Sequence, residues 1–149
     1  PFNAWVLTKS LETMSMRVNR MADTAFEIAT ALEGLKGVAR VIHPFLDSHP
    51  DSALAKKQML KGGTTLAIQL DADKANTFAF MNALEVIDIS NNLGDSRSLI
   101  THPSSSTHRR LGTETQLKMG ITESTVRLSV GLEHPGDLIT DLKLALKHL

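Results

Sequence analysis

One stretch of this sequence decides the fold class: Thr125-Val126-Arg127-Leu128-Ser129-Val130-Gly131-Leu132. Apolar and polar side chains alternate along it, and successive side chains of a strand point to opposite faces. One face therefore carries Val126, Leu128 and Val130, and the other carries Arg127, Ser129 and Gly131. We predict a half-buried strand over residues 125–132, whose apolar face needs a covering layer of helices.

Helical and extended patterns alternate along the rest of the chain. Apolar residues at three- and four-residue spacing predict a helix over about residues 3–35, in two pieces. Further helices are predicted over about residues 53–60, 74–84, 113–119 and 137–149, and short strands over residues 38–42, 64–70, 86–89 and 98–101. This order predicts an α/β or α+β layer, with helices on one or both faces of a small sheet. Because several connections are short, some strand pairs should be antiparallel.

Composition excludes several classes of protein. The chain has 149 residues, which suits one domain, and its 16 basic and 16 acidic residues cancel. Proteins held mainly on nucleic acid phosphates or on anionic lipid need a basic excess, so neither partner is expected. The absence of cysteine excludes a disulfide framework, a thiolate metal site and a cysteine nucleophile. No apolar run approaches the roughly 18 residues of a membrane span.

Neither the histidines nor the paired glycines form a known ligand motif. The histidines are His43, His49, His102, His108, His134 and His148. No two of them have the i, i+4 spacing of a helical metal site, so we expect no metal and interpret them as solvated loop residues. Gly62-Gly63 lacks the spacing of a dinucleotide fingerprint or a P-loop, and we interpret it as a helix stop before a strand.

Two features have the chemistry of a binding site. Arg127 has small neighbours on its face, so its planar guanidinium has room for a carboxylate in a bidentate arrangement. A solvated or salt-bridged arginine explains the same pattern, and both interpretations stay open. The stretch 91–99 is dense in hydrogen-bonding groups and follows a predicted strand, a place where α/β proteins often carry ligand loops. A structural Asx turn is the alternative there.

At this loop the sequence resembles a known enzyme family. The strings that carry the resemblance are Ile89-Ser90-Asn91-Asn92-Leu93-Gly94-Asp95-Ser96-Arg97-Ser98-Leu99-Ile100-Thr101-His102-Pro103, Thr107-His108 and Val126-Arg127-Leu128-Ser129-Val130-Gly131-Leu132-Glu133. In this order they resemble the Cys/Met metabolism family of pyridoxal-phosphate enzymes, from Pro1-Phe2-Asn3-Ala4-Trp5 to Asp141-Leu142. The loop form Asn92-x-Gly94-Asp95-x-Arg97 is similar to that of the acylhomoserine sulfhydrylases, and most of all to the O-succinylhomoserine branch.

The resemblance implies a specific place in a larger fold. The chain would be the small C-terminal domain of a fold-type I pyridoxal-phosphate-dependent transferase, an α+β sandwich with helices packed on a small, mainly antiparallel sheet. Residues 1–20 would form the connecting helix from a cofactor-binding large domain, and residues 21–149 the C-terminal domain. The start at Pro1, without an initiator methionine, agrees with the expectation that the chain is part of a longer enzyme.

The resemblance also implies a cofactor, a reaction and site residues. The full-length enzyme would use pyridoxal phosphate to replace the succinate of O-succinylhomoserine by sulfide, giving homocysteine in methionine biosynthesis. Arg127 falls where the family's arginine holds the substrate α-carboxylate, and Asn92 falls where related lyases and synthases have a serine near it. The family's Schiff-base lysine has a Ser-x-x-Lys context, so Lys9, in the connecting helix, is rejected for that role. Since the chain also has no tyrosine to stack the cofactor ring, we expect it to bind no cofactor and to be inactive alone.

The expected partners are small molecules: the amino-acid substrate and sulfide, with neither nucleic acid nor membrane. The full-length enzyme would be a cytoplasmic homotetramer. A cystathionine γ-synthase or γ-lyase of the same family is the first alternative. A non-catalytic α/β binding module, which kept the scaffold and lost the chemistry, is the second.

Overall fold

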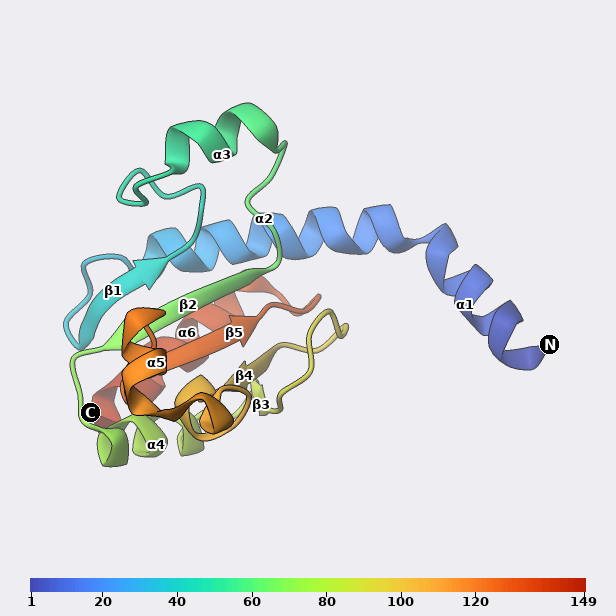
Figure 1. The fold of residues 1–149 in the computed structure, drawn as a ribbon. Helices are drawn as coiled ribbons and strands as arrows, with labels where there is room; N and C mark the ends of the chain where they lie inside the picture. Colours follow the sequence, from blue (N-terminus) through green and yellow to red (C-terminus); the bar gives the residue numbers. More distant parts are fainter.

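Five strands form a single mixed sheet in the order β1-β2-β5-β4-β3 (Figure 1). The computed structural model describes residues 1–149. The strands are β1 (Val38–Ile42), β2 (Thr65–Leu70), β3 (Asp88–Ile89), β4 (Leu99–Thr101) and β5 (Thr125–Ser129). The helices are α1 (Phe2–Glu12), α2 (Met14–Leu32), α3 (Ser52–Gln58), α4 (Lys74–Asn82), α5 (Gly112–Lys118) and α6 (Pro135–Ala145), and 3-10 turns cover Pro103–Ser105, Arg109–Leu111 and Leu146–His148. The predicted order of elements is confirmed, including the division of the first helix into two pieces.

Strand β5 lies in the middle of the sheet and is antiparallel to both of its neighbours, β2 and β4. The pair β1 and β2 is also antiparallel, whereas β3 and β4 are parallel. The register places Arg127 of β5 between Ala67 of β2 and Thr101 of β4. The predicted α/β class with a mainly antiparallel sheet is therefore confirmed.

One face of the sheet forms the hydrophobic core with α2, α4 and α6. The side chains that meet there are fully buried or nearly so: Val126 and Leu128 of β5, Leu66 and Ile68 of β2, Ile28 and Leu32 of α2, Phe80 of α4, and Leu138 and Leu142 of α6. Burying one such side chain contributes about 1.5–3 kcal/mol, so this face holds the helices on the sheet. Arg127 alternates with Val126 and Leu128 and so lies on the opposite face.

The expectation that β5 is half-buried is wrong, because its second face is also largely covered. Thr125 and Ser129 are only 4% and 1% exposed. The loop over residues 90–98 covers Ser129, and the N–H of Gly94 donates to its hydroxyl at 3.1 Å. The turn before β5 covers Thr125, and the N–H of Thr122 donates to its hydroxyl at 3.0 Å. Residues 130–132 lie beyond the observed strand, where Leu132 bonds to this loop.

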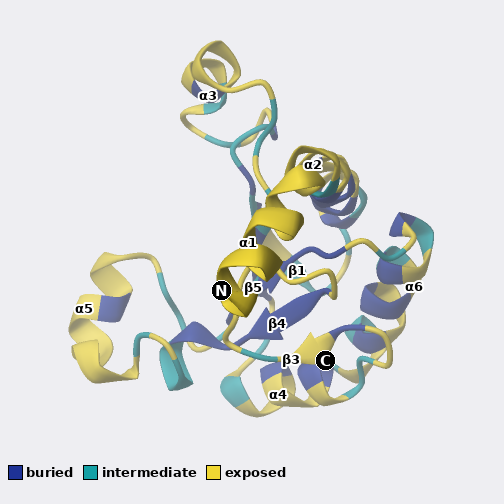
Figure 2. Cartoon of the chain, turned by 90° about the vertical axis from the view of Figure 1, so that its right-hand side faces the viewer, coloured by how far each residue is buried: buried dark blue, intermediate teal, exposed yellow.

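Helix α1 extends away from the sheet (Figure 1) and has no buried residue (Figure 2). Its apolar side chains face solvent: Phe2 is 71% exposed, Trp5 59% and Leu7 68%. The first buried residue along the chain is Met21 in α2. The amphipathic pattern predicted the helix correctly, but within this chain nothing packs on its apolar side. The division into residues 1–20 and 21–149 stays a prediction.

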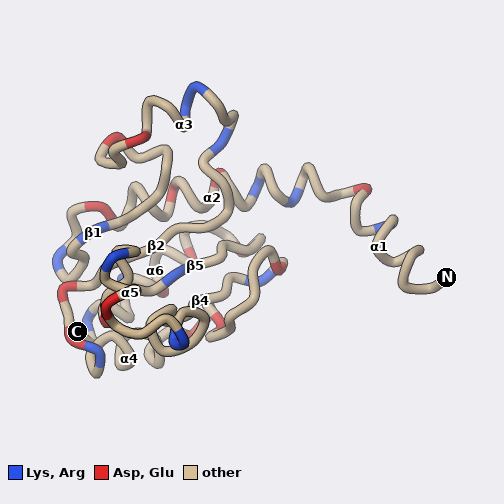
Figure 3. Tube along the Cα trace, in the orientation of Figure 1, with Lys and Arg blue, Asp and Glu red and all other residues tan.

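Charges are dispersed over the surface. Basic and acidic residues are interspersed along the chain (Figure 3), and six ion pairs join exposed or half-exposed side chains. No helix combines the length and hydropathy that crossing a bilayer requires. No three His, Asp or Glu side chains converge in the way that metal ligands do.

Candidate functional site

Arg127 is half-buried in the middle of the sheet and retains free hydrogen-bonding capacity. Its Nη2 donates a 2.9 Å hydrogen bond to the carbonyl oxygen of Asn91. Its Nε is buried without a hydrogen-bond partner, and Arg127 takes part in none of the six ion pairs. Burial lowers the pKa of Arg127, yet a guanidinium stays protonated in proteins. The salt-bridged alternative therefore does not hold, and Arg127 is a charged donor without an acidic partner on the face of the sheet opposite the core.

The 90–98 loop lies against Arg127 and is fastened to the strands beside it. The hydroxyl of Thr101 on β4 donates to the side-chain oxygen of Asn91 at 2.6 Å, next to the bond that Asn91 accepts from Arg127. The loop also reaches β5 through the bond from Gly94 to Ser129. The structure thus brings together the two predicted features, although Asn91 and Arg127 are 36 residues apart in sequence.

Asn92 lies on this loop with its side chain exposed and its amide free of hydrogen bonds within the chain. Its backbone N–H donates to the hydroxyl of Ser90 at 3.3 Å. The contact with Arg127 comes instead from the main chain of Asn91, which sequence reasoning missed, since a backbone carbonyl has no residue-type signal. The Asx turn considered for this stretch is present at Asp95, whose Oδ1 accepts from the N–H of Arg97 at 3.1 Å. That bond lowers the pKa of Asp95.

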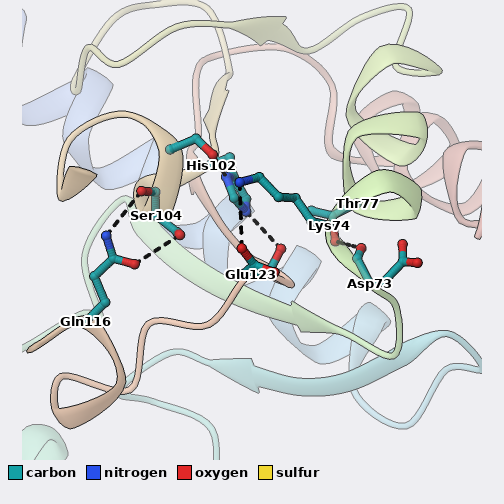
Figure 4. A network of polar contacts seen from close by, with 8 residues as sticks. Asp73, Lys74, Thr77, His102, Ser104, Gln116 and Glu123 are labelled. Carbon is teal, nitrogen blue, oxygen red and sulfur yellow. Dashed lines mark hydrogen bonds and ion pairs between the residues drawn. The ribbon is translucent and has the colours of Figure 1, made fainter. Parts of the chain in front are cut away.

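His102 is part of a structural network (Figure 4). It is 3% exposed, with Nε2 2.8 Å from the carbonyl oxygen of Glu123 and Nδ1 2.9 Å from the hydroxyl of Ser105. Its ring meets that of Phe78 edge-on, with 5.0 Å between the ring centroids. Both ring nitrogens are therefore engaged, and they join the turn after β4 to the turn before β5. The interpretation of His102 as a solvated loop residue is wrong.

His43 is buried as well, against Gly62. It is 0% exposed, its Nδ1 accepts from the N–H of Phe45 at 3.3 Å, and burial lowers its pKa. A Cβ added to Gly62 would lie 2.3 Å from Cε1 of the His43 ring. Helix α3 ends at Gln58, before the glycines. Gly62 therefore provides a close contact rather than the predicted helix stop, and His43 is not a solvated residue.

Lys9 has none of the surroundings of a lysine that forms a Schiff base. It lies on the exposed helix α1 and pairs with Glu12 at 2.7 Å, with about half of its side chain in solvent. A nucleophilic lysine is normally activated by desolvation or by a neighbouring cation. Lys9 has neither, so it does not fit the binding of pyridoxal phosphate.

Comparison with known proteins identifies a family. A family model described as Cys/Met metabolism PLP-dependent enzyme matches residues 1–147. The O-succinylhomoserine sulfhydrylase of Mycobacterium tuberculosis (strain ATCC 25618 / H37Rv) is 46% identical over 149 residues, which cover 97% of this chain and 37% of the relative. The O-succinylhomoserine sulfhydrylase of Pseudomonas aeruginosa is 35% identical, with 100% of this chain and 37% of the relative covered.

Solved structures of two related enzymes also match this chain over nearly its whole length. Cystathionine gamma synthase from Xanthomonas oryzae pv. oryzae, in complex with aminoacrylate and cysteine, superposes with a TM-score of 0.93 at 34% identity, covering 99% of this chain and 38% of the other. A putative O-acetylhomoserine (thiol)-lyase from Campylobacter jejuni, which contains N'-pyridoxyl-lysine-5'-monophosphate, has a TM-score of 0.93 at 36% identity, with 99% and 35% covered. The chain spans 37% of the length of the sulfhydrylases it matches. It belongs to the Cys/Met metabolism family of pyridoxal-phosphate-dependent enzymes.

Proposed function

We propose that this chain is the C-terminal part of an enzyme that makes homocysteine from O-succinylhomoserine and sulfide, in methionine biosynthesis. In this reaction the bond from Cγ to the succinate oxygen breaks, and a bond from Cγ to sulfur forms. The sulfhydrylases that are 46% and 35% identical to this chain support the proposal. Within the chain, one observation carries it: the guanidinium of Arg127 has a buried Nε without a partner.

Arg127 is assigned the binding of the substrate α-carboxylate. A buried donor left unpaired costs about 1–3 kcal/mol, so the side chain favours a ligand that accepts from Nε. A carboxylate does this and can accept from a neighbouring Nη at the same time, since its two oxygens match the guanidinium fork. A single arginine suffices for a small amino acid, which agrees with a formal net charge of zero.

Asn92 is assigned a second hydrogen bond to the same carboxylate. It directly follows Asn91, whose carbonyl oxygen is 2.9 Å from Nη2 of Arg127. Its amide group is exposed and donates to nothing else in the chain. An amide N–H is an effective donor to a carboxylate.

The residues of this chain do not complete a site for pyridoxal phosphate. Lys9 is exposed and ion-paired, and there is no tyrosine. We therefore place the Schiff-base lysine in a segment of the enzyme outside these residues. When bound, pyridoxal phosphate acts as an electron sink for bond changes near the substrate amine. We expect the isolated chain to be inactive and the complete enzyme to be a cytoplasmic homotetramer.

A cystathionine γ-synthase or γ-lyase activity is the second candidate. The similarity to the cystathionine gamma synthase of Xanthomonas oryzae, at a TM-score of 0.93, favours it. Both candidates require a site for the α-carboxylate of an amino acid. They differ in the sulfur compound, which is sulfide for the sulfhydrylase and cysteine or cystathionine for the alternatives.

The test uses the protein encoded by the complete reading frame that contains this chain, loaded with pyridoxal phosphate. We expect turnover of O-succinylhomoserine with sulfide at a higher kcat/KM than with cysteine. Arg127→Ala should raise KM about a hundredfold, which corresponds to roughly 3 kcal/mol, and leave the cofactor absorbance unchanged. Arg40→Ala is the matched control, because Arg40 is an exposed arginine on β1 and should leave KM unchanged.

Three other results would contradict parts of the proposal. Preference for cysteine would establish the synthase alternative. Unchanged kinetics in Arg127→Ala would remove Arg127 from the carboxylate site. A reading frame without a Ser-x-x-Lys segment before Pro1, together with no turnover, would establish a non-catalytic module.

A further inference from the structure

Glu133 holds one end of the 90–98 loop with a hydrogen bond to each of its carboxylate oxygens. Its Oε1 accepts from the backbone N–H of Ser98 at 2.6 Å, and its Oε2 accepts from the Ser98 hydroxyl at 2.8 Å. The oxygen of that hydroxyl accepts in turn from the N–H of Gly131 at 2.9 Å. Ser98 is 0% exposed, whereas Glu133 is partly exposed, so these bonds lie at the edge of the buried region. The carboxylate thus joins the end of the loop to the segment that follows β5.

Gly131 shows how closely these two segments lie. A Cβ added at this position would be 2.5 Å from the carbonyl oxygen of Ser96, from the carbonyl carbon of Arg97 and from Oε2 of Glu133. Beside it, the N–H of Leu132 donates to the same Ser96 oxygen at 2.8 Å. Only a residue without a side chain admits this approach, so the spacing between the loop and the segment is set by direct backbone contact.

The opposite end of the loop is the part that touches Arg127. The Asn91 carbonyl oxygen accepts from Nη2 of Arg127. Between the two ends, residues 91–97 are exposed. The ion pair of Arg97 with Asp88 also bridges this region at 3.0 Å, but its side chains are 73% and 55% exposed, and such pairs contribute little. The Asn91 end is held locally by the hydroxyl of Thr101, and the far end of the loop is held by Glu133 through Ser98, so both attachments set the position of the Asn91 carbonyl.

We propose that Glu133 is a positioning residue for the carboxylate site: through Ser98 it holds the loop whose Asn91 carbonyl orients the guanidinium of Arg127. This inference rests on the proposed function of Arg127. Glu133 itself does not contact the substrate. It acts on the position of the Arg127 guanidinium, which does contact the substrate, and a small displacement of such a group lowers the rate of the reaction.

The test is a set of variants in the complete, pyridoxal-phosphate-loaded protein. Glu133→Gln replaces one acceptor oxygen by an amide and should raise KM for O-succinylhomoserine about tenfold, with kcat changed less than about twofold. Asp141→Asn is the matched control. Asp141 is a buried carboxylate that accepts three backbone N–H groups, none of which belongs to residues 90–98, so this variant should lose stability without a change in KM.

Two further measurements separate positioning from general destabilisation. In an Arg127→Ala background, Glu133→Gln should have no further effect on KM, because it acts through Arg127; additive effects would contradict the proposal. Hydrogen exchange of residues 90–98 should accelerate in Glu133→Gln by more than any loss of global stability explains, and in Asp141→Asn by no more than that loss explains. If Glu133→Gln fails to fold, Ser98→Ala provides the same test, since it removes the hydroxyl between Gly131 and Glu133.

The variants distinguish failure of the positioning role of Glu133 from failure of the carboxylate-binding role of Arg127. If Arg127→Ala raises KM and neither Glu133→Gln nor Ser98→Ala does, the positioning role is overturned and the proposed function stands. If Arg127→Ala also leaves KM unchanged, the carboxylate-binding role of Arg127 fails, and the positioning role that rests on it fails too.

Discussion

Asp141→Asn is expected to destabilise this chain by about 2–4 kcal/mol. Asp141 on α6 is 5% exposed, and its carboxylate accepts from the N–H groups of Glu85, Val86 and Ile87 at 2.9, 3.1 and 3.1 Å. An asparagine has one acceptor oxygen. With that oxygen toward Val86 and Ile87, its NH2 group faces the N–H of Glu85. An unpaired donor costs about 1–3 kcal/mol, and loss of the negative charge weakens the remaining two bonds by about 1 kcal/mol in total.

The assay is urea unfolding of the 149-residue chain, followed by far-UV circular dichroism and linear extrapolation to water. Tryptophan fluorescence is unsuitable, because Trp5 is 59% exposed on α1 and would report little of the core. Asp137→Asn, an exposed position in the first turn of the same helix, is the control and should cost less than about 1 kcal/mol. A loss for Asp141→Asn below about 0.5 kcal/mol would refute the view that this carboxylate joins α6 to the segment before β3.

Two other predictions concern the buried features of the fold. Burial lowers the pKa of His43 below its ordinary value of 6.5, so the unfolded chain takes up a proton at a higher pH than the folded chain does. The contribution of His43 to the free energy of unfolding should therefore be complete above about pH 6.5 and should decline as the pH falls toward the lowered pKa. Urea unfolding at about pH 7.5 and 5.5 should show that decline, and His43→Leu should reduce it; an equal decline in both proteins would show that His43 is not its source. Gly131→Ala should lower the melting temperature by several degrees or prevent folding, because its Cβ would lie 2.5 Å from two backbone atoms. Gly120→Ala is the control and should cost less, because its Cβ would meet no atom within 4 Å and only the positive φ of Gly120 would be strained. Equal melting temperatures for these two variants would contradict the close approach.

Local patterns predicted the elements of this fold well. The alternation over residues 125–132 identified the central strand and the face that enters the core, because Val126 and Leu128 require burial and β geometry alternates. Spacing of apolar residues also identified both pieces of the first helix. Periodicity alone shows that a face is apolar and not what covers it, and the apolar side chains of α1 are exposed.

The site itself was predictable only in part. Arg127 and the loop were recognised from their residue types, but the bond between them runs through the Asn91 carbonyl, and a main-chain atom has the same chemistry at every position. The attachment of Ser98 to Glu133 joins residues 35 apart and depends on how two loops meet. His43 and His102 were wrongly expected in solvent, because sequence spacing can exclude a metal motif without indicating burial.

A structure of the complete, pyridoxal-phosphate-loaded protein with an unreactive analogue of the amino-acid substrate would test the central claim most directly. We expect the analogue's α-carboxylate to lie about 3 Å from Nε and one Nη of Arg127, with the Asn91 carbonyl still bonded to Nη2. A carboxylate bound by other residues, with the Nε of Arg127 still unpartnered, would contradict it.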